Sequence, residues 1–315
     1  MVPEQPERQA GHGLPNKGMI SGTTALVALL GQPVSHSLSP VMQNAALKAM
    51  GLDWSFMALP CSADDLATVL KGLEAVGCRG LNVTIPHKQA VSSLCDELSP
   101  LAQRLGAVNT LTPLVNGGWH GDNTDVEGFV APLLQNNANW SGTRAVVLGC
   151  GGSARAVVAG LQDLNPSDIT IVGRRAETLH PFCNDLQQGR PANSVPLQPL
   201  LDTDPHLQTR IQQADLVVNT TPVGMSSHQP DRGPALPLGV DIWDKLNAQT
   251  VLYDLIYTPR PTPWLERGER LGCRTYDGLE MLVQQGAAAL RRWSDIDEVP
   301  VDAMREAALK NLSHP

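Results

Sequence analysis

The stretch RAVVLGCGGSARA, residues 144–156, decides the fold of this chain of 315 residues. Its first part, residues 144–148, is a short apolar run that predicts a strand, and the residues that follow as far as Leu161 predict an apolar helix. A turn rich in glycine separates the two segments. A strand, a glycine turn and a helix in this order form the unit that binds the pyrophosphate of a dinucleotide.

Each small residue of this turn has a separate physical role. Gly149 permits the tight turn after the strand, and Gly151 lets the backbone approach a phosphate closely. Ala154 stands where the helix needs a small residue to pack against the strand. With Gly152 and Ser153 between them, these residues form the predicted phosphate site.

The next predicted strand, residues 168–172, indicates which dinucleotide binds. An NAD site carries an Asp or Glu after this strand to bind the ribose hydroxyls, whereas this chain has Gly173, Arg174 and Arg175. Two guanidinium groups suit a 2′-phosphate, which they can contact in a bidentate manner. Arginine at a helix start also opposes the helix dipole, so a bound anion explains it better than helix stability does. We therefore expect NADP.

In the first half of the chain, the stretch NVTIPHK, residues 82–88, places polar groups at the end of a predicted strand. The β-branched run 81–85 predicts the strand, and Pro86 ends it because proline lacks the N–H that a sheet requires. Ligands of α/β sheets bind at the carboxyl ends of strands. Lys88 is thus a candidate proton donor, or a point charge for an oxyanion.

A hydroxyl-rich loop, residues 31–40, follows the apolar run 25–30. Ser39 is expected to cap the next helix, with Pro40 as its first residue. Ser37 has no such structural role. Two hydroxyl groups beside a helix N-terminus suit a carboxylate ligand.

Two further polar stretches follow, GAVNT at residues 106–110 and GDNTD at residues 121–125. The second is typical of an Asx-rich turn. An Asp close to Lys88 would hold its ammonium group in place and form an acid–base pair with it. Asp125 is our candidate for that partner.

Five motifs, in this order along the chain, resemble those of the shikimate dehydrogenase family. The first is residues 37–40 of the hydroxyl-rich loop, which is called the serine loop below. The others are residues 82–88, residues 121–125, the glycine-rich turn after residue 148, called the glycine loop, and the stretch DGLEMLVQQ at residues 277–285. The resemblance covers roughly residues 24–294. It implies an NADP-dependent oxidoreductase that reduces 3-dehydroshikimate to shikimate in aromatic amino acid biosynthesis.

The resemblance also implies a role for individual residues. Ser37 and Ser39 would hold the substrate carboxylate, and Lys88 and Asp125 would be the catalytic pair. The ring hydroxyls would be bound by Asn82, Thr84, Lys88, Asn109, Asp125 and Gln285, with Tyr257 near the substrate. Further cofactor contacts are expected from Thr220, Leu255, Gly278 and Met281, the last two beside the nicotinamide.

Two departures from the family pattern lie on the cofactor side. The usual Asn-Arg-Thr after the second strand of that domain reads Gly-Arg-Arg at residues 173–175. This change removes hydrogen bonds to the adenosine side, and the extra arginine is available to compensate. Pro222, within the loop 219–225, replaces a small polar residue. A proline turn accounts for it, but not for Asn219 at the strand end.

Alternation of strands and helices predicts an α/β fold with two domains and a cleft between them. The N-terminal domain is a mostly parallel α/β substrate domain, and the C-terminal one is a Rossmann-type NADP-binding domain. The expected divisions are a disordered leader (1–22), the substrate domain (23–124), the cofactor domain (125–276) and helices that pack back on the substrate domain (277–315). Strands are expected at 25–30, 54–59, 81–85 and 109–115 and near Val146, Ile169, Leu216, Leu252 and Arg274, and helices at 40–50, from Ser62, at 125–134 and at 278–293.

Composition excludes several other classes of protein. A net charge of −8 argues against a nucleic-acid surface, and no apolar run approaches the roughly 18 residues of a membrane span. The six cysteines have no Cys-x-x-Cys spacing, which favours reduced thiols in a cytoplasmic protein. We predict no metal site, because lysine already polarises the carbonyl. The sequence leaves the oligomeric state open, a homodimer included.

Three alternatives stay open. The first is a quinate/shikimate dehydrogenase that uses NAD and makes room for the extra hydroxyl of quinate near Ser37 and Ser39. The second is a non-catalytic module that binds shikimate-like acids and regulates a partner. It could lose Lys88, Asp125 or the glycine loop, which this chain retains. The third, an NADP-dependent reductase for an unrelated ketone, leaves the motifs of the first domain unexplained.

Overall fold

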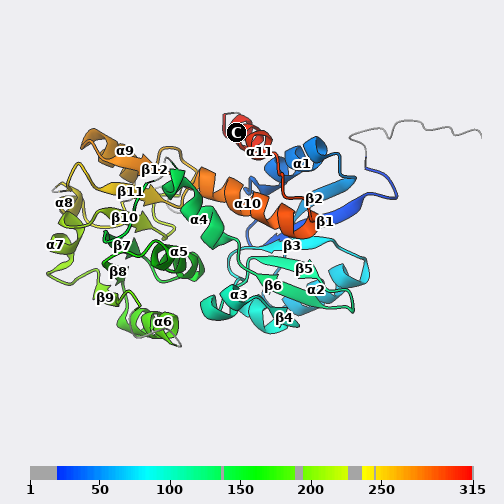
Figure 1. Cartoon of the computed structure of the whole chain (residues 1–315), viewed down its shortest axis with the longest axis horizontal. Helices are drawn as coiled ribbons and strands as arrows, with labels where there is room; N and C mark the ends of the chain where they lie inside the picture. Colours follow the sequence, from blue (N-terminus) through cyan, green and yellow to red (C-terminus); the bar gives the residue numbers. More distant parts are fainter. Residues whose placement is uncertain (1–19, 136–137, 189–193, 226–235, 245, 314–315) are drawn as a thin grey trace, which may run out of the picture.

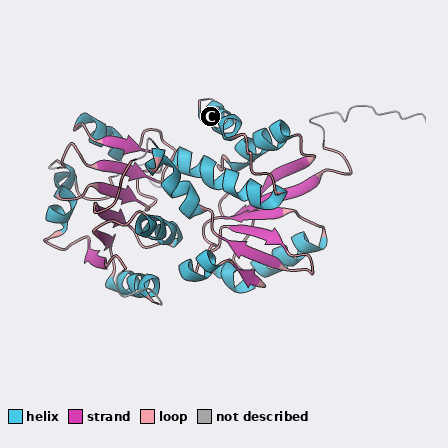
Figure 2. Ribbon diagram, viewed as in Figure 1, coloured by secondary structure: helices cyan, strands magenta, loops and turns pink. Residues whose placement is uncertain are grey.

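The computed structural model describes residues 20–135, 138–188, 194–225, 236–244 and 246–313. Helices and strands alternate in two lobes, each built around one sheet (Figure 1, Figure 2). This arrangement confirms the predicted fold class. The expected leader, residues 1–22, lies outside the described residues except for its last three positions. The four domain boundaries stay predictions.

The first lobe contains a mixed sheet with the order β2-β1-β3-β5-β6-β4 among the described residues. Its elements are β1 (Ala25–Gly31), α1 (Ser39–Met50), β2 (Trp54–Pro60), α2 (Leu66–Ala75), β3 (Gly80–Val83), the 3₁₀ helix η1 (Ala90–Leu94), β4 (Glu97–Leu98), α3 (Pro100–Leu105), β5 (Thr110–Pro113) and β6 (Trp119–Asp122). Strands β2, β1 and β3 run parallel. Strand β5 is antiparallel to β3 and β6, and its hairpin turns at Gly117 and Gly118, which both have positive φ.

The second lobe contains a parallel sheet with the order β12-β11-β10-β7-β8-β9. Its elements are β7 (Arg144–Leu148), α5 (Gly152–Asp163), β8 (Asp168–Gly173), α6 (Ala176–Gln187), β9 (Leu197–Leu201), α7 (Leu207–Gln212), β10 (Leu216–Asn219), α8 (Val240–Trp243), β11 (Val251–Asp254), α9 (Pro263–Arg270) and β12 (Arg274–Tyr276). The order reverses direction at β7, which is the arrangement of a Rossmann-type domain. The glycine loop leaves β7 at this reversal point.

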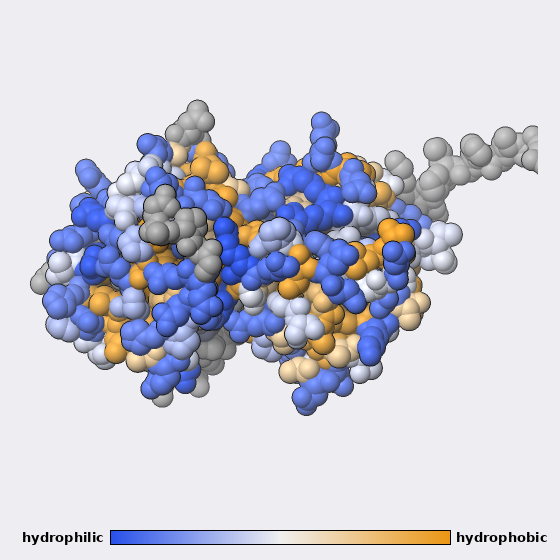
Figure 3. Space-filling view, turned by 60° about the horizontal axis from the view of Figure 1, so that its bottom comes forward, coloured by the Kyte–Doolittle hydropathy of each residue, from blue (hydrophilic) through white to orange (hydrophobic). Residues whose placement is uncertain are grey.

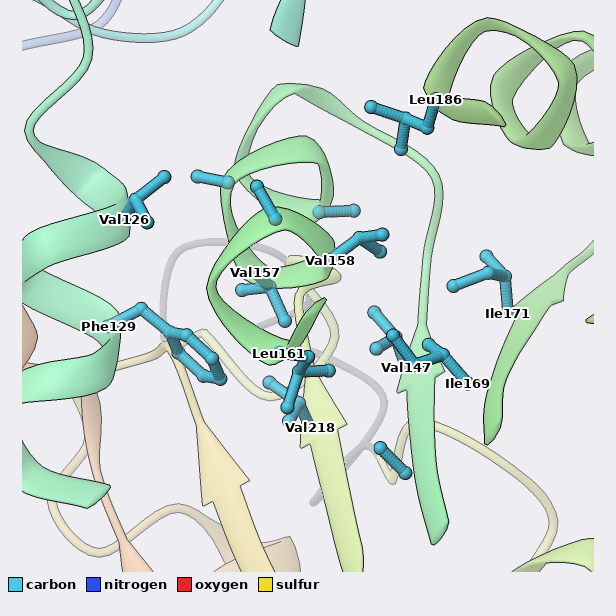
Figure 4. Packing of buried hydrophobic residues seen from close by; sticks show 14 of the residues in the cluster. Val126, Phe129, Val147, Val157, Val158, Leu161, Ile169, Ile171, Leu186 and Val218 are labelled. Carbon is cyan, nitrogen blue, oxygen red and sulfur yellow. The ribbon is translucent and has the colours of Figure 1, made fainter. Parts of the chain in front are cut away.

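Two helices connect the lobes. Helix α4 (Asp125–Leu133) packs against α5 and against α10 (Gly278–Ser294). Phe129 of α4 and Val157 of α5 belong to one buried cluster that continues under the sheet of the second lobe (Figure 4). A Cβ atom at Gly160 of α5 would lie 2.9 Å from the Phe129 ring, so this glycine allows the two helices to approach closely.

The last two helices return to the first lobe. Helix α10 starts in the second lobe, directly after β12, and runs to the first lobe (Figure 1). Its Trp293 stacks on Phe56 at 6.3 Å between ring centroids and donates from Nε1 to the Leu111 carbonyl at 3.0 Å. Helix α11 (Val301–Leu312) packs on α1. The core of the first lobe therefore includes side chains from both ends of the sequence.

Three local predictions are wrong. The N-cap of α1 is Leu38, and Ser39 is the first helical residue. Strand β3 ends at Val83, two residues before the predicted end, because the chain turns at Thr84. Helix α2 begins at Leu66 and not at Ser62, because Ser62 closes a preceding turn, with its Oγ accepting from Asp65 N at 3.2 Å.

Candidate active site

Lys88 and Asp125, the predicted acid–base pair, form an ion pair. Lys88, in the loop after β3, places its Nζ 2.6 Å from Oδ2 of Asp125, and the two side chains are only 13% and 6% exposed. Asp125 is the first residue of α4, where the positive end of the helix dipole favours a carboxylate. Because little water reaches this pair, the charge of the Lys88 ammonium group acts strongly on a neighbouring group.

Asn109 fixes the second oxygen of that carboxylate. Its Nδ2 lies 2.9 Å from Oδ1 of Asp125 and 3.5 Å from Oε1 of Gln285. Its Oδ1 accepts from the Thr124 backbone N–H at 2.8 Å. Asp125 is thus held from one side by Asn109 and from the other by Lys88, while Gln285 of α10 joins the same group.

The threonines within this group are residues that the sequence did not identify. Asn82 donates to Thr110 Oγ1 and to the Asn109 carbonyl, both at 3.3 Å. The Thr110 and Thr124 hydroxyls contact each other at 3.1 Å, and both residues are fully buried. In the sequence Thr110 follows Asn109, and Thr124 precedes Asp125. This position next to a predicted site residue is the signal that could have identified both threonines.

The serine loop lies beside the loop that carries Thr84. Gln32 donates from its backbone N to the Ile85 carbonyl at 3.0 Å, and a Cβ atom at Gly31 would collide with the half-buried Thr84 side chain. Ser37 Oγ is half-exposed and accepts from the Ser39 backbone N at 3.2 Å. The first predicted carboxylate contact is thus near the surface, whereas Ser39 itself is buried.

Tyr257, from the second lobe, meets this serine loop. Its hydroxyl hydrogen-bonds the backbone of Leu38, between the two predicted serines. Burial raises the pKa of Tyr257, and the bond to Leu38 offsets part of that rise. The structure therefore brings Tyr257 to the same end of β1 as Ser37 and Ser39.

The glycine loop has the shape that a pyrophosphate needs. Gly149 has a φ of +104°, and a Cβ atom there would lie 2.7 Å from Oγ1 of Thr220. Gly151 is the N-cap of α5 without a side-chain cap, and a Cβ atom there would meet nothing within 4 Å. The N–H groups of the first helical turn, which includes the half-buried Ser153, are therefore accessible to an anion. Ala154 is fully buried against the sheet.

The glycine loop faces the lysine of the acid–base pair. A Cβ atom built on Gly152 would lie 3.8 Å from Cβ of Lys88. The predicted cofactor loop and the predicted catalytic residue thus meet where the two lobes join. In the space-filling view the lobes are separated by a waist with strongly hydrophilic residues (Figure 3).

The two arginines after β8 are available for a ligand. Gly173 is buried at the end of the strand, and Arg174 and Arg175 are exposed at the start of α6. Within the part of the chain that the structure describes, neither guanidinium has a hydrogen-bond or ion-pair partner. Unpaired guanidinium groups at this strand end fit the 2′-phosphate of NADP.

The start of α10 brings together the remaining cofactor candidates. A Cβ atom at Gly278 would lie 2.0 Å from the Leu255 carbonyl oxygen, so only glycine fits there. Met281 is buried one turn further along α10, and Gln285 follows it on the same face. Helix α10 therefore carries predicted cofactor contacts at its start and a predicted substrate contact beyond them.

A buried carboxyl group, Asp254, lies at the end of β11 and was not predicted. Its Oδ1 accepts from Asn219 Nδ2 at 3.0 Å and from Ile256 N at 3.1 Å, and its Oδ2 accepts from Thr262 Oγ1 at 2.8 Å. Burial raises the pKa of Asp254 to about 7, and these three hydrogen bonds offset only part of the rise. Asn219 also accepts from Thr221 Oγ1 at 2.7 Å, which gives this strand-end asparagine a structural role.

Metal-binding and membrane-spanning features were sought in the described residues. No group of three His, Cys, Asp or Glu side chains there could hold a metal ion, and no helix there is long and apolar enough to cross a membrane. The six cysteines are all free thiols.

A Rossmann-type lobe, whose glycine loop faces a lysine–aspartate pair on a second α/β lobe, defines a two-domain oxidoreductase that uses a dinucleotide. Two family models match segments of the chain. The model for the shikimate dehydrogenase substrate binding domain matches residues 29–111, and that for the shikimate 5′-dehydrogenase C-terminal domain matches residues 278–309. The shikimate dehydrogenase (NADP(+)) of Prochlorococcus marinus strain AS9601 is 47% identical over 294 residues, which are 93% of this chain and 100% of the relative. The chain belongs to the shikimate dehydrogenase family.

Solved structures share this architecture. A crystal structure of a shikimate dehydrogenase in complex with NADP⁺ matches with a TM-score of 0.83 and 32% identity, covering 95% of this chain and 99% of that one. The quinate dehydrogenase of Corynebacterium glutamicum in complex with NAD matches with a TM-score of 0.81 and 29% identity, covering 91% and 99%. The fold alone therefore does not separate these two activities.

Proposed function

We propose that the chain is an NADP-dependent shikimate dehydrogenase, which catalyses the reversible reduction of 3-dehydroshikimate to shikimate in aromatic amino acid biosynthesis. The observation that carries the proposal is the buried contact between Lys88 and Asp125, opposite Gly152 of the glycine loop. In this proposal Lys88 of the substrate lobe would transfer the proton, next to the loop of the other lobe that would bind the cofactor.

On the substrate side, two sets of residues would orient the ring. The hydroxyls of Ser37 and Ser39 would bind the carboxylate at the end of β1, with Tyr257 beside them. The hydroxyl groups of the ring would be bound by Asn82, Thr84, Lys88, Asn109, Asp125 and Gln285. For all of these except Thr84, the support is the hydrogen-bond network around Asn109, which holds the side chains in advance of binding.

The chemistry assigned to the chain's own residues is electrostatic and acid–base. Bound NADPH would supply the hydride that reduces the carbonyl carbon. Lys88 would stabilise the negative charge that develops on the carbonyl oxygen and donate a proton to it. Asp125 would keep the ammonium group in position, and Asn109 would keep Asp125 in position. In the reverse direction, the same pair would accept the hydroxyl proton.

On the cofactor side, the residues fit a phosphorylated dinucleotide. The open backbone at Gly151 suits the pyrophosphate, together with Gly149, Gly152, Ser153 and Ala154. Arg174 and Arg175, next to Gly173, would bind the 2′-phosphate. Thr220 and Leu255 would also contact the cofactor, and the nicotinamide would lie beside Gly278 and Met281.

The setting of the protein is also a proposal. Free thiols at all six cysteines support a cytoplasmic location, where thiols stay reduced. The partners would be small molecules, without nucleic acid, because the net charge is −8. Association with a second copy stays a prediction, which size-exclusion chromatography with light scattering would test.

The experiment that tests the function is a steady-state assay of shikimate and of quinate, each with NADP⁺ and with NAD⁺. We expect the highest kcat/KM with shikimate and NADP⁺. Appreciable quinate turnover with NAD⁺ would move the chain to the quinate dehydrogenases. Tight shikimate binding without turnover would favour a regulatory binding module and contradict the role of Lys88. Turnover of an unrelated ketone alone would contradict the substrate assignment.

A further inference from the structure

Arg155 connects the second lobe to the first through one hydrogen bond. It lies in the first turns of α5, and its Nη1 donates to the Leu105 carbonyl oxygen at 3.0 Å. Leu105 is the last residue of α3, where unpaired carbonyls give a helix its negative end. The Arg155 side chain is only 12% exposed, so a charged donor meets a partly charged acceptor away from bulk water.

The other contacts of the guanidinium, which leave Nε without a hydrogen-bond partner, lie within the second lobe. Its Nη2 donates to Oδ2 of Asp185 at 3.0 Å, and its plane covers the Phe182 ring at 5.4 Å from the centroid. Both partners belong to α6. The side chain is therefore fixed on the cofactor lobe, and only Nη1 reaches across to the substrate lobe.

The segment after Leu105 contacts both members of the Lys88–Asp125 pair. Gly106 ends α3 with a φ of +58°, and two residues later the Val108 backbone N donates to the Lys88 carbonyl at 2.7 Å. Asn109, which orients Asp125, is the next residue. The Leu105 carbonyl, which accepts from Arg155, is thus only three residues before Val108 and four before Asn109, which contact Lys88 and Asp125.

Besides the buried cluster that α5 shares with Leu105 and Ala107, two residues of α5 contact the substrate lobe near the site. Gly152, at its first turn, faces Lys88, and Arg155, three residues later on the same face, holds Leu105. Two contacts from one rigid helix fix both the distance of α5 from the substrate lobe and its direction. The contact at Gly152 alone would set only a minimum distance.

We propose that Arg155 is a positioning residue that sets the spacing between the glycine loop and the Lys88–Asp125 pair. Arg155 acts through the Leu105 carbonyl. The inference rests on the proposed function, because the spacing it sets is the one between cofactor and substrate. A displacement of about 1 Å between reacting groups is enough to lower turnover about 10²-fold.

The test compares Arg155→Met, which keeps the aliphatic stem, with Asp185→Asn, which removes only the partner on α6. We expect kcat of Arg155→Met to fall about 10- to 100-fold, the size of loss that misplaced reacting groups cause. Shikimate binding without cofactor, followed by calorimetry, should stay within about twofold, because that site lies in the other lobe. Asp185→Asn should retain nearly full turnover, and Arg155→Lys, which can still donate to Leu105, should recover part of the loss.

A second readout does not depend on turnover. Small-angle X-ray scattering of the ligand-free proteins should show altered lobe spacing in Arg155→Met and unaltered spacing in Asp185→Asn. Wild-type kcat and scattering in Arg155→Met, or equal losses in both variants, would overturn the inference. If Arg155→Met fails to fold, Arg155→Lys still tests the inference, because its weaker contact with Leu105 should lower kcat and alter lobe spacing by less than full loss of the contact but more than Asp185→Asn does. Absence of shikimate turnover in the wild type would instead refute the proposed function, and the scattering comparison would still test Arg155.

Discussion

Asp125 has a different partner on each carboxylate oxygen, Lys88 on Oδ2 and Asn109 on Oδ1. An ion pair at the protein surface usually contributes little to stability, but this pair is nearly buried and belongs to a hydrogen-bond network. The network fixes the direction of the ammonium group rather than only its presence. Removing the ammonium group should therefore affect the chemical step more than the folded structure.

We expect Lys88→Ala to lower kcat by about 10²–10⁴-fold, the range for a general acid–base group. The measurement is steady-state shikimate oxidation with NADP⁺, with circular dichroism as the control for folding. Lys71→Ala, an exposed change in α2, should leave kcat unchanged. An increase confined to KM, with kcat intact, would contradict the catalytic role.

A second prediction concerns the two exposed arginines after β8. Replacing both Arg174 and Arg175 with Ala should raise KM for NADP⁺ far more than KM for NAD⁺, because only NADP⁺ carries the 2′-phosphate. Arg210→Ala is the matched control, since Arg210 lies near Asp168 at the opposite end of β8. Equal losses with both cofactors would contradict the 2′-phosphate assignment.

Among the elements, the contact between α4 and α10 joins the two sides of the site. Helix α4 begins with Asp125, and α10 carries Met281 and Gln285. The helices touch at Gly128, where a Cβ atom would lie 2.7 Å from the Met281 carbonyl and 2.8 Å from Cβ of Gln285. The two helices can therefore pack this closely only because residue 128 is glycine.

We expect Gly128→Ala to lower the free energy of unfolding by about 1–3 kcal/mol, the usual cost of overpacking, and to lower kcat because Asp125 and Gln285 move apart. The control is Gly72→Ala in α2, where a Cβ atom would meet nothing within 4 Å. That change should stabilise the protein by about 0.5–1 kcal/mol, since Ala is the better helix former. Urea unfolding of both variants checks the opposite signs, and stabilisation by Gly128→Ala would refute the close packing.

The sequence predicted those elements whose pattern is local. Strands β1, β2, β7 and β10 follow from apolar or β-branched runs, and the glycine turn follows from its spacing. Strand β9 was missed because Pro199 interrupts it, which only an edge strand tolerates. Within the site, Lys88 and Asp125 were found through their motifs. Asp254 was missed because its partners Asn219 and Thr262 come from other elements, and tertiary structure alone brings them together.

At the scale of the whole molecule, Asp254 makes stability depend on pH. Its raised pKa means that the folded protein holds a proton up to about pH 7, whereas an unfolded Asp loses it near pH 4. The folded state is therefore favoured below about pH 4, and this contribution is lost as pH rises towards 7. A shift of this size corresponds to roughly a few kcal/mol.

We expect Asp254→Asn, which cannot ionise, to gain stability relative to the wild type as pH rises from about 5 to about 8. The measurement is the difference in Tm between variant and wild type across that range. Asp204→Asn is the control, because the His206 backbone N–H lowers the pKa of that carboxyl, so it stays ionised over this range and its Tm difference should not change with pH. A Tm difference for Asp254→Asn that is constant with pH would show that Asp254 ionises normally.

The return of α10 and α11 to the first lobe has a consequence for synthesis on the ribosome. The apolar side chains Met42 and Leu47 of α1 are covered in part by Met304 and its neighbours, which lie about 250 positions further along the chain. At roughly 5–20 residues per second, those neighbours are made on the order of 10–50 s later. During that interval the nascent first lobe exposes an unfinished apolar face to chaperones, and only the last helices complete it.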